Sequence, residues 1–243
     1  GSVISPTIMG SVATDNGRLE SGASGTVVTD IVARGTFDGS RLVMQNITGK
    51  TANNGTITGG GAIGFGGIGG LSMQLDFQAD NALLINRDDI SAQVSGPLSM
   101  LYGDDGGVIF GDVVLNRSFF RLGQADVEQL LPQLDVRELA REDDAFEIPR
   151  TRAKPWRWAV KANAADRLEV EGMGLSSIWS ADLDIGGQLD NPRLIGRADL
   201  VRGDFDFAGK NFRLDNGVIR FAGEVPANPT LDVSASASID GLD

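Results

Sequence analysis

The sequence contains no cysteine and no histidine among its 243 residues. Without cysteine the chain has no disulfide, no thiol nucleophile and no thiolate ligand for a metal. Without histidine it lacks the usual general base, the commonest zinc ligand and the central member of a Ser-His-Asp triad. We therefore expect that the protein is not an enzyme and that it needs no cofactor and no metal.

Positive charge and long apolar runs are also scarce. The 21 lysines and arginines are outnumbered by 33 aspartates and glutamates, which gives a net charge of −12. Nucleic-acid binding depends on a basic surface that neutralises phosphates, so we expect no nucleic-acid partner. The longest uncharged stretch, residues 51–75, is rich in glycine and contains Asn53 and Asn54, which makes it a poor membrane-spanning segment.

What the chain does have is glycine, with 33 residues, and many short segments in which apolar and polar residues alternate. Residues 189–221 show this best, since Phe205 and Phe207 alternate with Asp204 and Asp206. Successive side chains of a strand point to opposite faces, so each segment has one apolar face and one charged face. With little helix to cover the apolar face, an all-β fold is predicted, either a closed sandwich filled by its own side chains or an open trough.

Composition divides the chain into four parts. Gly1 and Ser2 are typical of a cloning remnant, so we expect the sequence to be an excised fragment. Residues 3–123 and 155–243 consist of strand-like segments. Residues 124–154 contain leucines at helical spacing, followed by a charged stretch, and predict a short helix or a loop excursion between the two strand-rich parts.

The two strand-rich parts resemble each other. The sequence ADNAL at residues 79–83 corresponds to AADRL at 164–168, and IFGDVVL at 109–115 corresponds to LIGRADL at 194–200. We interpret this as one supersecondary unit used twice. The alternative is chance, because amphipathic strands all resemble one another.

Two patterns look like chemical sites and have simpler explanations. Residues 64–69 match GxGxxG, but strand-like sequence lies on both sides and no helix follows, so loose glycine turns are favoured over a dinucleotide site. Asp182 with Asp184, and Asp204 with Asp206, place paired carboxylates on a strand face, as calcium sites and glycosidases do. Arginines share that face, which favours a solvated surface of cross-strand salt bridges.

The last third of the chain carries a series of motifs in a fixed order. They are a G-x-x-x-NP-x-L-x-G strand pair, an RG-x-(Y/F)-x-F-x-G hairpin, an F-x-L-x-x-G-x-I-x-F hairpin and a P-x-LD strand. These motifs occupy GQLDNPRLIGRADLVRGDFDFAGKNFRLDNGVIRF at 187–221 and AGEVPANPTLDVSASA at 222–237. Over residues 156–239 the chain resembles the C-terminal conserved domain of the TamB family, an AsmA-like family of the bacterial translocation and assembly module.

The resemblance implies a β-taco, an elongated amphipathic sheet that curls into a trough so that its apolar face encloses a hydrophobic groove. It also implies a periplasmic location, with the full-length protein anchored in the inner membrane and this C-terminal part near the outer membrane. A TamA-like outer-membrane barrel protein is the implied partner. Relatives are linked to phospholipid movement between the two membranes.

From the apolar parity and the resemblance together we predict a segment of a lipid conduit, which shields phospholipid acyl chains for outer-membrane homeostasis. The residues predicted to line its groove are Leu183, Ile185, Leu189, Leu194, Leu200, Phe205, Phe207, Phe212, Leu214, Ile219, Phe221, Leu231 and Val233.

A second hypothesis is an assembly factor that works with TamA in the secretion and insertion of outer-membrane proteins such as autotransporters. Its exposed strand edges would pair with nascent outer-membrane proteins. A third hypothesis, an elongated surface adhesin, predicts a packed interior with no groove.

Overall fold

The computed structural model describes residues 7–22, 24–66, 70–122, 155–189, 191–225 and 227–236. The all-β prediction is confirmed, since these ranges contain twelve strands, one 3-10 turn (η1, Ala52–Asn54) and no α-helix. The helix or loop excursion predicted at 124–154 lies outside the described residues. The strands are β1 (Ile8–Ser21), β2 (Thr26–Gly39), β3 (Arg41–Lys50), β4 (Thr56–Phe65), β5 (Leu71–Asn86), β6 (Ile90–Gly103), β7 (Gly106–Arg121), β8 (Trp156–Gly172), β9 (Leu175–Gln188), β10 (Asn191–Phe207), β11 (Lys210–Ala222) and β12 (Thr230–Ser236).

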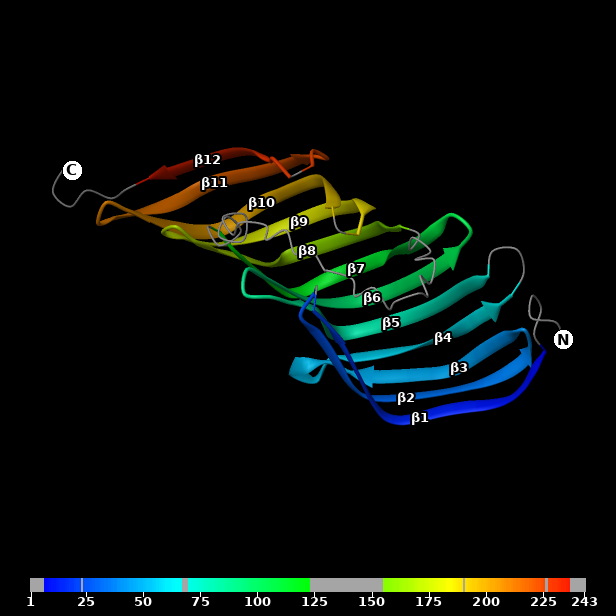
Figure 1. The fold of residues 1–243 in the computed structure, drawn as a ribbon. Helices are drawn as coiled ribbons and strands as arrows, with labels where there is room; N and C mark the ends of the chain where they lie inside the picture. Colours follow the sequence, from blue (N-terminus) through cyan, green and yellow to red (C-terminus); the bar gives the residue numbers. More distant parts are fainter. Residues whose placement is uncertain are drawn as a thin grey trace, which may run out of the picture.

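All twelve strands form one sheet, and their order in the sheet is their order in the sequence (Figure 1). Neighbouring strands are antiparallel except β7 and β8, which are parallel. The two strand-rich parts of the sequence therefore meet at the one parallel pair of the described sheet. In that sheet β1 and β12 are edge strands and are not joined to each other, so the sheet is open.

One face of this sheet is apolar along its whole length. In the ladders Leu75 lies opposite Met100, and Ile109 lies opposite both Met100 and Trp158. Side chains that face each other in a ladder share a face, and the period of two carries the pattern along each strand. The described residues form a single layer, so within that part of the chain only the curvature of the sheet covers the apolar face. The fold is consistent with a curled trough, as the resemblance implied.

Register shifts bend the strands along a common line, which we call the crease. A β-bulge inserts extra residues into one strand, bends it and increases its twist. Asn81 in β5 and Asp166 in β8 have positive φ values of 48° and 88° at such shifts. The shifts that define the crease lie between Ala79 and Ala82, Gln93 and Val94, Val114 and Ser118, Ala164 and Leu168, Leu200 and Arg202, and Leu214 and Asn216.

Glycines next to the crease let neighbouring backbones approach closely. Gly111 and Gly196 have φ values of 156° and 140°. A Cβ added at Gly111 would lie 2.2 Å from the carbonyl oxygen of Pro97, and one at Gly196 would lie 2.1 Å from that of Asp182. These two glycines occupy matching positions of the proposed internal repeat. Gly61 and Gly96 have the same geometry, so it does not distinguish the proposed repeat, which stays a prediction.

The best-buried side chains lie along the crease and are mostly small. Ala82 is fully buried, Ala164 is 1% exposed, and the one large residue among them, Trp179, is 2% exposed. The Trp179 indole N–H donates to Ser177 Oγ at 2.8 Å, and Ser177 Oγ donates in turn to the carbonyl oxygen of Val170 at 3.1 Å. Small side chains allow the two halves of each strand to fold toward each other, so the core fills the bottom of the trough.

The hairpin of β1 and β2 folds back on the sheet at its tip (Figure 1). The Asn86 backbone N–H, at the end of β5, donates to the carbonyl oxygen of Ser24 at 2.8 Å. Thr26 Oγ1 donates to the carbonyl oxygen of Leu84. Gly25 has φ of 65°, and a Cβ there would lie 2.0 Å from the carbonyl oxygen of Asn86. The tip therefore reaches past the shorter strands β3 and β4 and contacts β5.

Candidate functional site: the apolar face of the trough

The residues predicted to line a groove lie within β9–β12, except Leu189, which follows the last residue of β9. Within these strands the register puts them on one face. Leu194 lies opposite Ile185, and Ile219 lies opposite Leu231. The four strands thus bring together side chains that are up to 50 positions apart in the sequence (Leu183 to Val233).

Two of the register shifts keep this face continuous. Phe205 lies five positions after Leu200, an odd offset, so a regular strand would point the two side chains to opposite faces. The shift between Leu200 and Arg202 restores the phase, because Leu200 lies opposite Trp179 and Phe205 opposite Leu175 on the same face of β9. The shift after Leu214 has the same effect in β11.

The lining residues are covered unequally. Leu214 is 7% exposed, whereas Phe207 and Leu231 are each 63% exposed, and Leu189 and Val233 are each 43% exposed. Every residue of β12 is exposed. The apolar face therefore keeps accessible surface toward its rim and its last strand. The half-buried members of the set are Leu183, Ile185, Leu194, Leu200, Phe205, Phe212, Ile219 and Phe221.

The apolar face extends beyond the residues that the sequence analysis selected. Phe77 lies opposite Leu98, and Ile63 lies opposite Met73, on the face that continues into β9. The sequence signal was present, because the segment MQLDFQA at 73–79 alternates as cleanly as the C-terminal segments do. The motifs of the resemblance lie after residue 186, so the predicted lining residues came from the last four strands alone.

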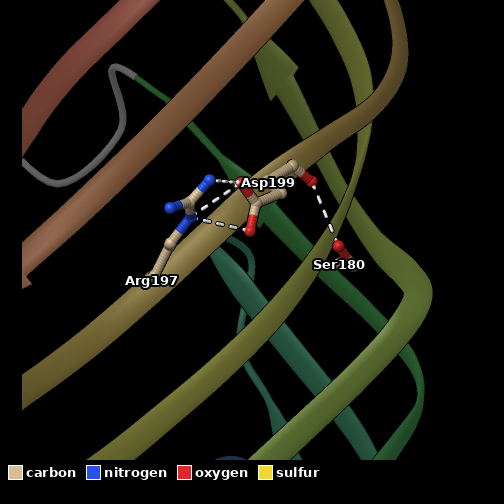
Figure 2. A network of polar contacts seen from close by, with 3 residues as sticks. All are labelled: Ser180, Arg197 and Asp199. Atoms are coloured by element: carbon tan, nitrogen blue, oxygen red, sulfur yellow. Dashed lines mark hydrogen bonds and ion pairs between the residues drawn. The ribbon is translucent and has the colours of Figure 1, made fainter.

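The opposite face, which we call the polar face, carries the charged side chains and is solvated, although apolar residues such as Val114 and Ile195 are exposed among them. Arg197 Nε donates to both carboxylate oxygens of Asp199, at 2.7 and 2.9 Å, and Ser180 Oγ donates to the backbone carbonyl of Asp199 at 3.4 Å (Figure 2). The hydrogen bond and the negative charge of Asp199 raise the pKa of the Arg197 guanidinium. Although Asp182 lies opposite Arg197 in the ladder, the ion pair forms along β10. The predicted cross-strand salt bridge is wrong for Arg197, because the i+2 carboxylate on its own strand lies within reach.

The paired carboxylates have polar neighbours on the charged face. Asp206 accepts a hydrogen bond from Asn211 Nδ2 at 2.9 Å, and Asp204 lies opposite Arg213 in the ladder. Over the described ranges no cluster of three or more Asp and Glu residues could hold a metal ion. These carboxylates belong to the solvated face.

The GxGxxG pattern at 64–69 starts at the end of β4, and the next described element is the strand β5. A dinucleotide site needs a helix after the motif, and a strand as the next described element disfavours such a site. In the described part of the chain no helix is long and apolar enough to cross a membrane.

Together these features define a class, an open single-layer β-sheet that presents one continuous apolar face and one charged face. A family model described as the TamB C-terminal domain matches residues 45–241. The chain therefore belongs to the TamB C-terminal domain family. This match begins in β3 and covers far more of the sheet than the motifs at 187–237 do. Membership indicates a TamB-related, non-enzymatic role in the bacterial envelope. Comparisons with curated proteins and with solved structures give no significant match.

Proposed function

We propose that this domain shields phospholipid acyl chains on its apolar face while lipids move between the inner and outer membranes. The observation that carries the proposal is an apolar face that is continuous across twelve strands and exposed toward its rim, where Phe207 and Leu231 are each 63% exposed. Monomeric proteins rarely leave such a surface uncovered, and large exposed apolar patches mark sites for a partner or a ligand.

The energetics favour a lipid chain as that ligand. Each buried CH₂ is worth about 0.8 kcal/mol, so an acyl chain of about sixteen carbons faces a barrier of roughly 13 kcal/mol when it leaves the bilayer for water. An apolar face that accepts the chain removes most of this barrier while the head group stays in water. Twelve strands spaced about 4.8 Å apart give a face about 50 Å long. The hydrocarbon of one leaflet is roughly 15 Å deep. The apolar face is therefore about three times as long as an acyl chain in a bilayer and can accommodate one along its length.

In this proposal the full-length protein is anchored in the inner membrane and crosses the periplasm, and this domain lies near the outer membrane. A TamA-like barrel protein would receive or position it there. Lipid transfer breaks no covalent bond, so the transport role needs no catalytic residue. The face itself supplies the function by solvating the lipid tail.

The test is a charge on the accessible rim of the face. Phe207→Glu should strongly reduce phospholipid that co-purifies with the protein in native mass spectrometry and phospholipid transfer between vesicles. Phe207 is largely exposed, so its replacement should leave the fold intact. The matched control is Phe110→Glu, because Phe110 is 36% exposed and lies on the polar face, opposite Ser99. Lipid capture that is equal in the two variants, or absent from the wild-type protein, would contradict the proposal.

A specific observation also favours the second candidate, assembly of outer-membrane proteins. In the described sheet β12 pairs with β11 alone, and all its residues are exposed. An exposed strand edge offers backbone donors and acceptors to an incoming strand. Photo-crosslinkers at Asp232 on β12 and at Leu183 in the trough separate the two candidates. Crosslinks from β12 to nascent outer-membrane proteins, with none from Leu183 to lipid, would favour assembly.

A further inference from the structure

Charged side chains are almost confined to the polar face of the sheet. Among the paired positions of the described strands, the register puts one charged side chain on the apolar face, that of Lys210 at the start of β11. Lys210 lies opposite Phe207, in the ladder that also pairs Phe205 with Phe212. The intervening pair, Asp206 and Asn211, lies on the polar face. Lys210 is thus a single cation on an apolar surface.

The turn between β10 and β11 fixes this position. Ala208 and Gly209 have positive φ values of 50° and 76°, as a tight two-residue hairpin turn requires. Such a turn sets the register, so Lys210 is held beside Phe207 at the rim of the trough. A shift of the register by one residue would move Lys210 to the polar face.

Phenylalanines occupy the positions next to Lys210 on the apolar face. The rings of Phe205 and Phe207 are stacked, with centroids 5.9 Å apart and an interplanar angle of 13°. Phe207 is 63% exposed, and Phe212 is half-buried on the same face. The side chain of Lys210 is exposed, and it forms no ion pair or hydrogen bond with the described part of the chain. Its ammonium group is therefore free to meet an anion next to an apolar surface.

We propose that Lys210 binds the phosphate of a phospholipid whose acyl chain lies on Phe205, Phe207 and Phe212. The inference rests on the proposed function and adds the place and the charge of the head group. A lysine is a compact point charge that pairs with phosphate, and its four-carbon stem can lie along an apolar surface while the ammonium group stays in water. The protein as a whole is acidic, with a net charge of −12. Lys210 nevertheless puts a positive charge on the apolar face, where the acyl chains would lie.

The experiment compares two probes that carry the same fluorescent acyl chain, phosphatidylglycerol and diacylglycerol, as monomers in solution. Lys210→Gln should weaken phosphatidylglycerol binding by about two- to five-fold, the upper part of the range for one exposed ion pair, and should leave diacylglycerol binding unchanged. Lys210→Glu should weaken phosphatidylglycerol binding further, because the new carboxylate would repel the lipid phosphate. The matched control is Lys161→Gln, which removes an exposed lysine on the polar face, opposite Asp184.

The outcomes separate the head-group inference from the proposed function. Wild-type protein that binds neither probe would overturn both. Wild-type protein that binds both probes, with phosphatidylglycerol binding unaffected by Lys210→Gln, would overturn the role of Lys210 and leave the acyl-chain role standing. Equal loss of the two probes in Lys210→Gln would also overturn the phosphate contact. Competition by glycerol phosphate as strong as that by the lipid would mean a site for free phosphate, and would overturn the lipid assignment.

Discussion

The middle strands and the last strands of the sheet use the same alternation of apolar and polar residues, yet they differ in what covers the apolar face. In β5 and β8, Ala82 and Ala164 are at most 1% exposed, whereas in β12 Leu231 is 63% exposed. The middle strands carry small residues where register shifts fold each strand on itself. The comparison shows that alternation decides which face is apolar, and that curvature decides how much of it stays open.

The division also separates stability from binding. The crease contributes the buried contacts, including the fully packed indole of Trp179, while the rim of β10–β12 presents Phe207 and Leu231 to solvent. Substitutions along the crease should therefore alter the free energy of unfolding, and substitutions at the rim should alter ligand capture. The experiments below test this division, from the largest expected effect to the smallest.

The largest difference is expected from a bulky residue placed in each region. Ala82→Phe should destabilise the protein by about 3 kcal/mol, because overpacking a closed core forces side chains and backbone apart. Ala235→Phe, in the exposed strand β12, should change the free energy of unfolding by less than about 0.5 kcal/mol. Urea unfolding followed by circular dichroism measures both. Equal effects would mean that the crease is not the core.

The second test concerns the close backbone approach at the crease. Gly196→Ala should cost about 2 kcal/mol, because φ of 140° is strained for any residue with a Cβ. The added methyl would also lie 2.1 Å from the carbonyl oxygen of Asp182. Gly22→Ala is the control, since a Cβ there meets nothing within 4 Å. Thermal unfolding should give a clearly lower Tm for the first variant and an unchanged Tm for the second.

The third test divides the residues predicted from the sequence to line the groove. Leu214→Ala should destabilise the protein by about 2.5 kcal/mol, because Leu214 is 7% exposed and its truncation leaves a cavity. Leu231→Ala should change stability by at most about 0.5 kcal/mol, and it should reduce the amount of co-purified phospholipid. Native mass spectrometry and denaturant unfolding on the same samples check the pair. A stable Leu214→Ala variant would place Leu214 with the open rim.

The smallest effect is expected on the polar face. The raised pKa of Arg197 means that its contribution is fully present below its ordinary pKa and is lost only as the pH rises above it, far beyond neutrality. Stability should therefore not depend on this pair between pH 6 and 9. Asp199→Asn should leave the Tm unchanged at about 0.15 M salt, because exposed ion pairs are screened. A measurable loss would indicate that the pair supports the curvature of β10.

The parts of the fold that the sequence predicted depend on local patterns. Alternation across Phe205 and Phe207 is visible without a structure, and it assigned them to the same face as Phe212. Glycine positions and motif order predicted the all-β class and the family. Leu200 and Phe205 could be assigned to one face because residues 194–200 and residues 204–207 each show their own alternation.

The parts that could not be predicted depend on three-dimensional relations. The segments at 79–83 and 164–168 look like ordinary strand sequence, and only the backbone reveals that Asn81 and Asp166 adopt positive φ and bend the sheet. The partner of Arg197 depends on a choice of rotamer between Asp199 on its own strand and Asp182 across the ladder. The position of Lys210 on the apolar face follows from the turn, whose conformation the sequence only suggests.

The open edges at β1 and β12 have a consequence for how such a molecule can change size. An open sheet can be lengthened at either edge. A new hairpin can pair with an edge strand and leave the packing of the existing strands unchanged. Each added hairpin would lengthen the apolar face by about 10 Å. Duplication of a unit such as the proposed one, whose two copies contain Gly111 and Gly196, is therefore a simple genetic route to a longer reach across a compartment of any width.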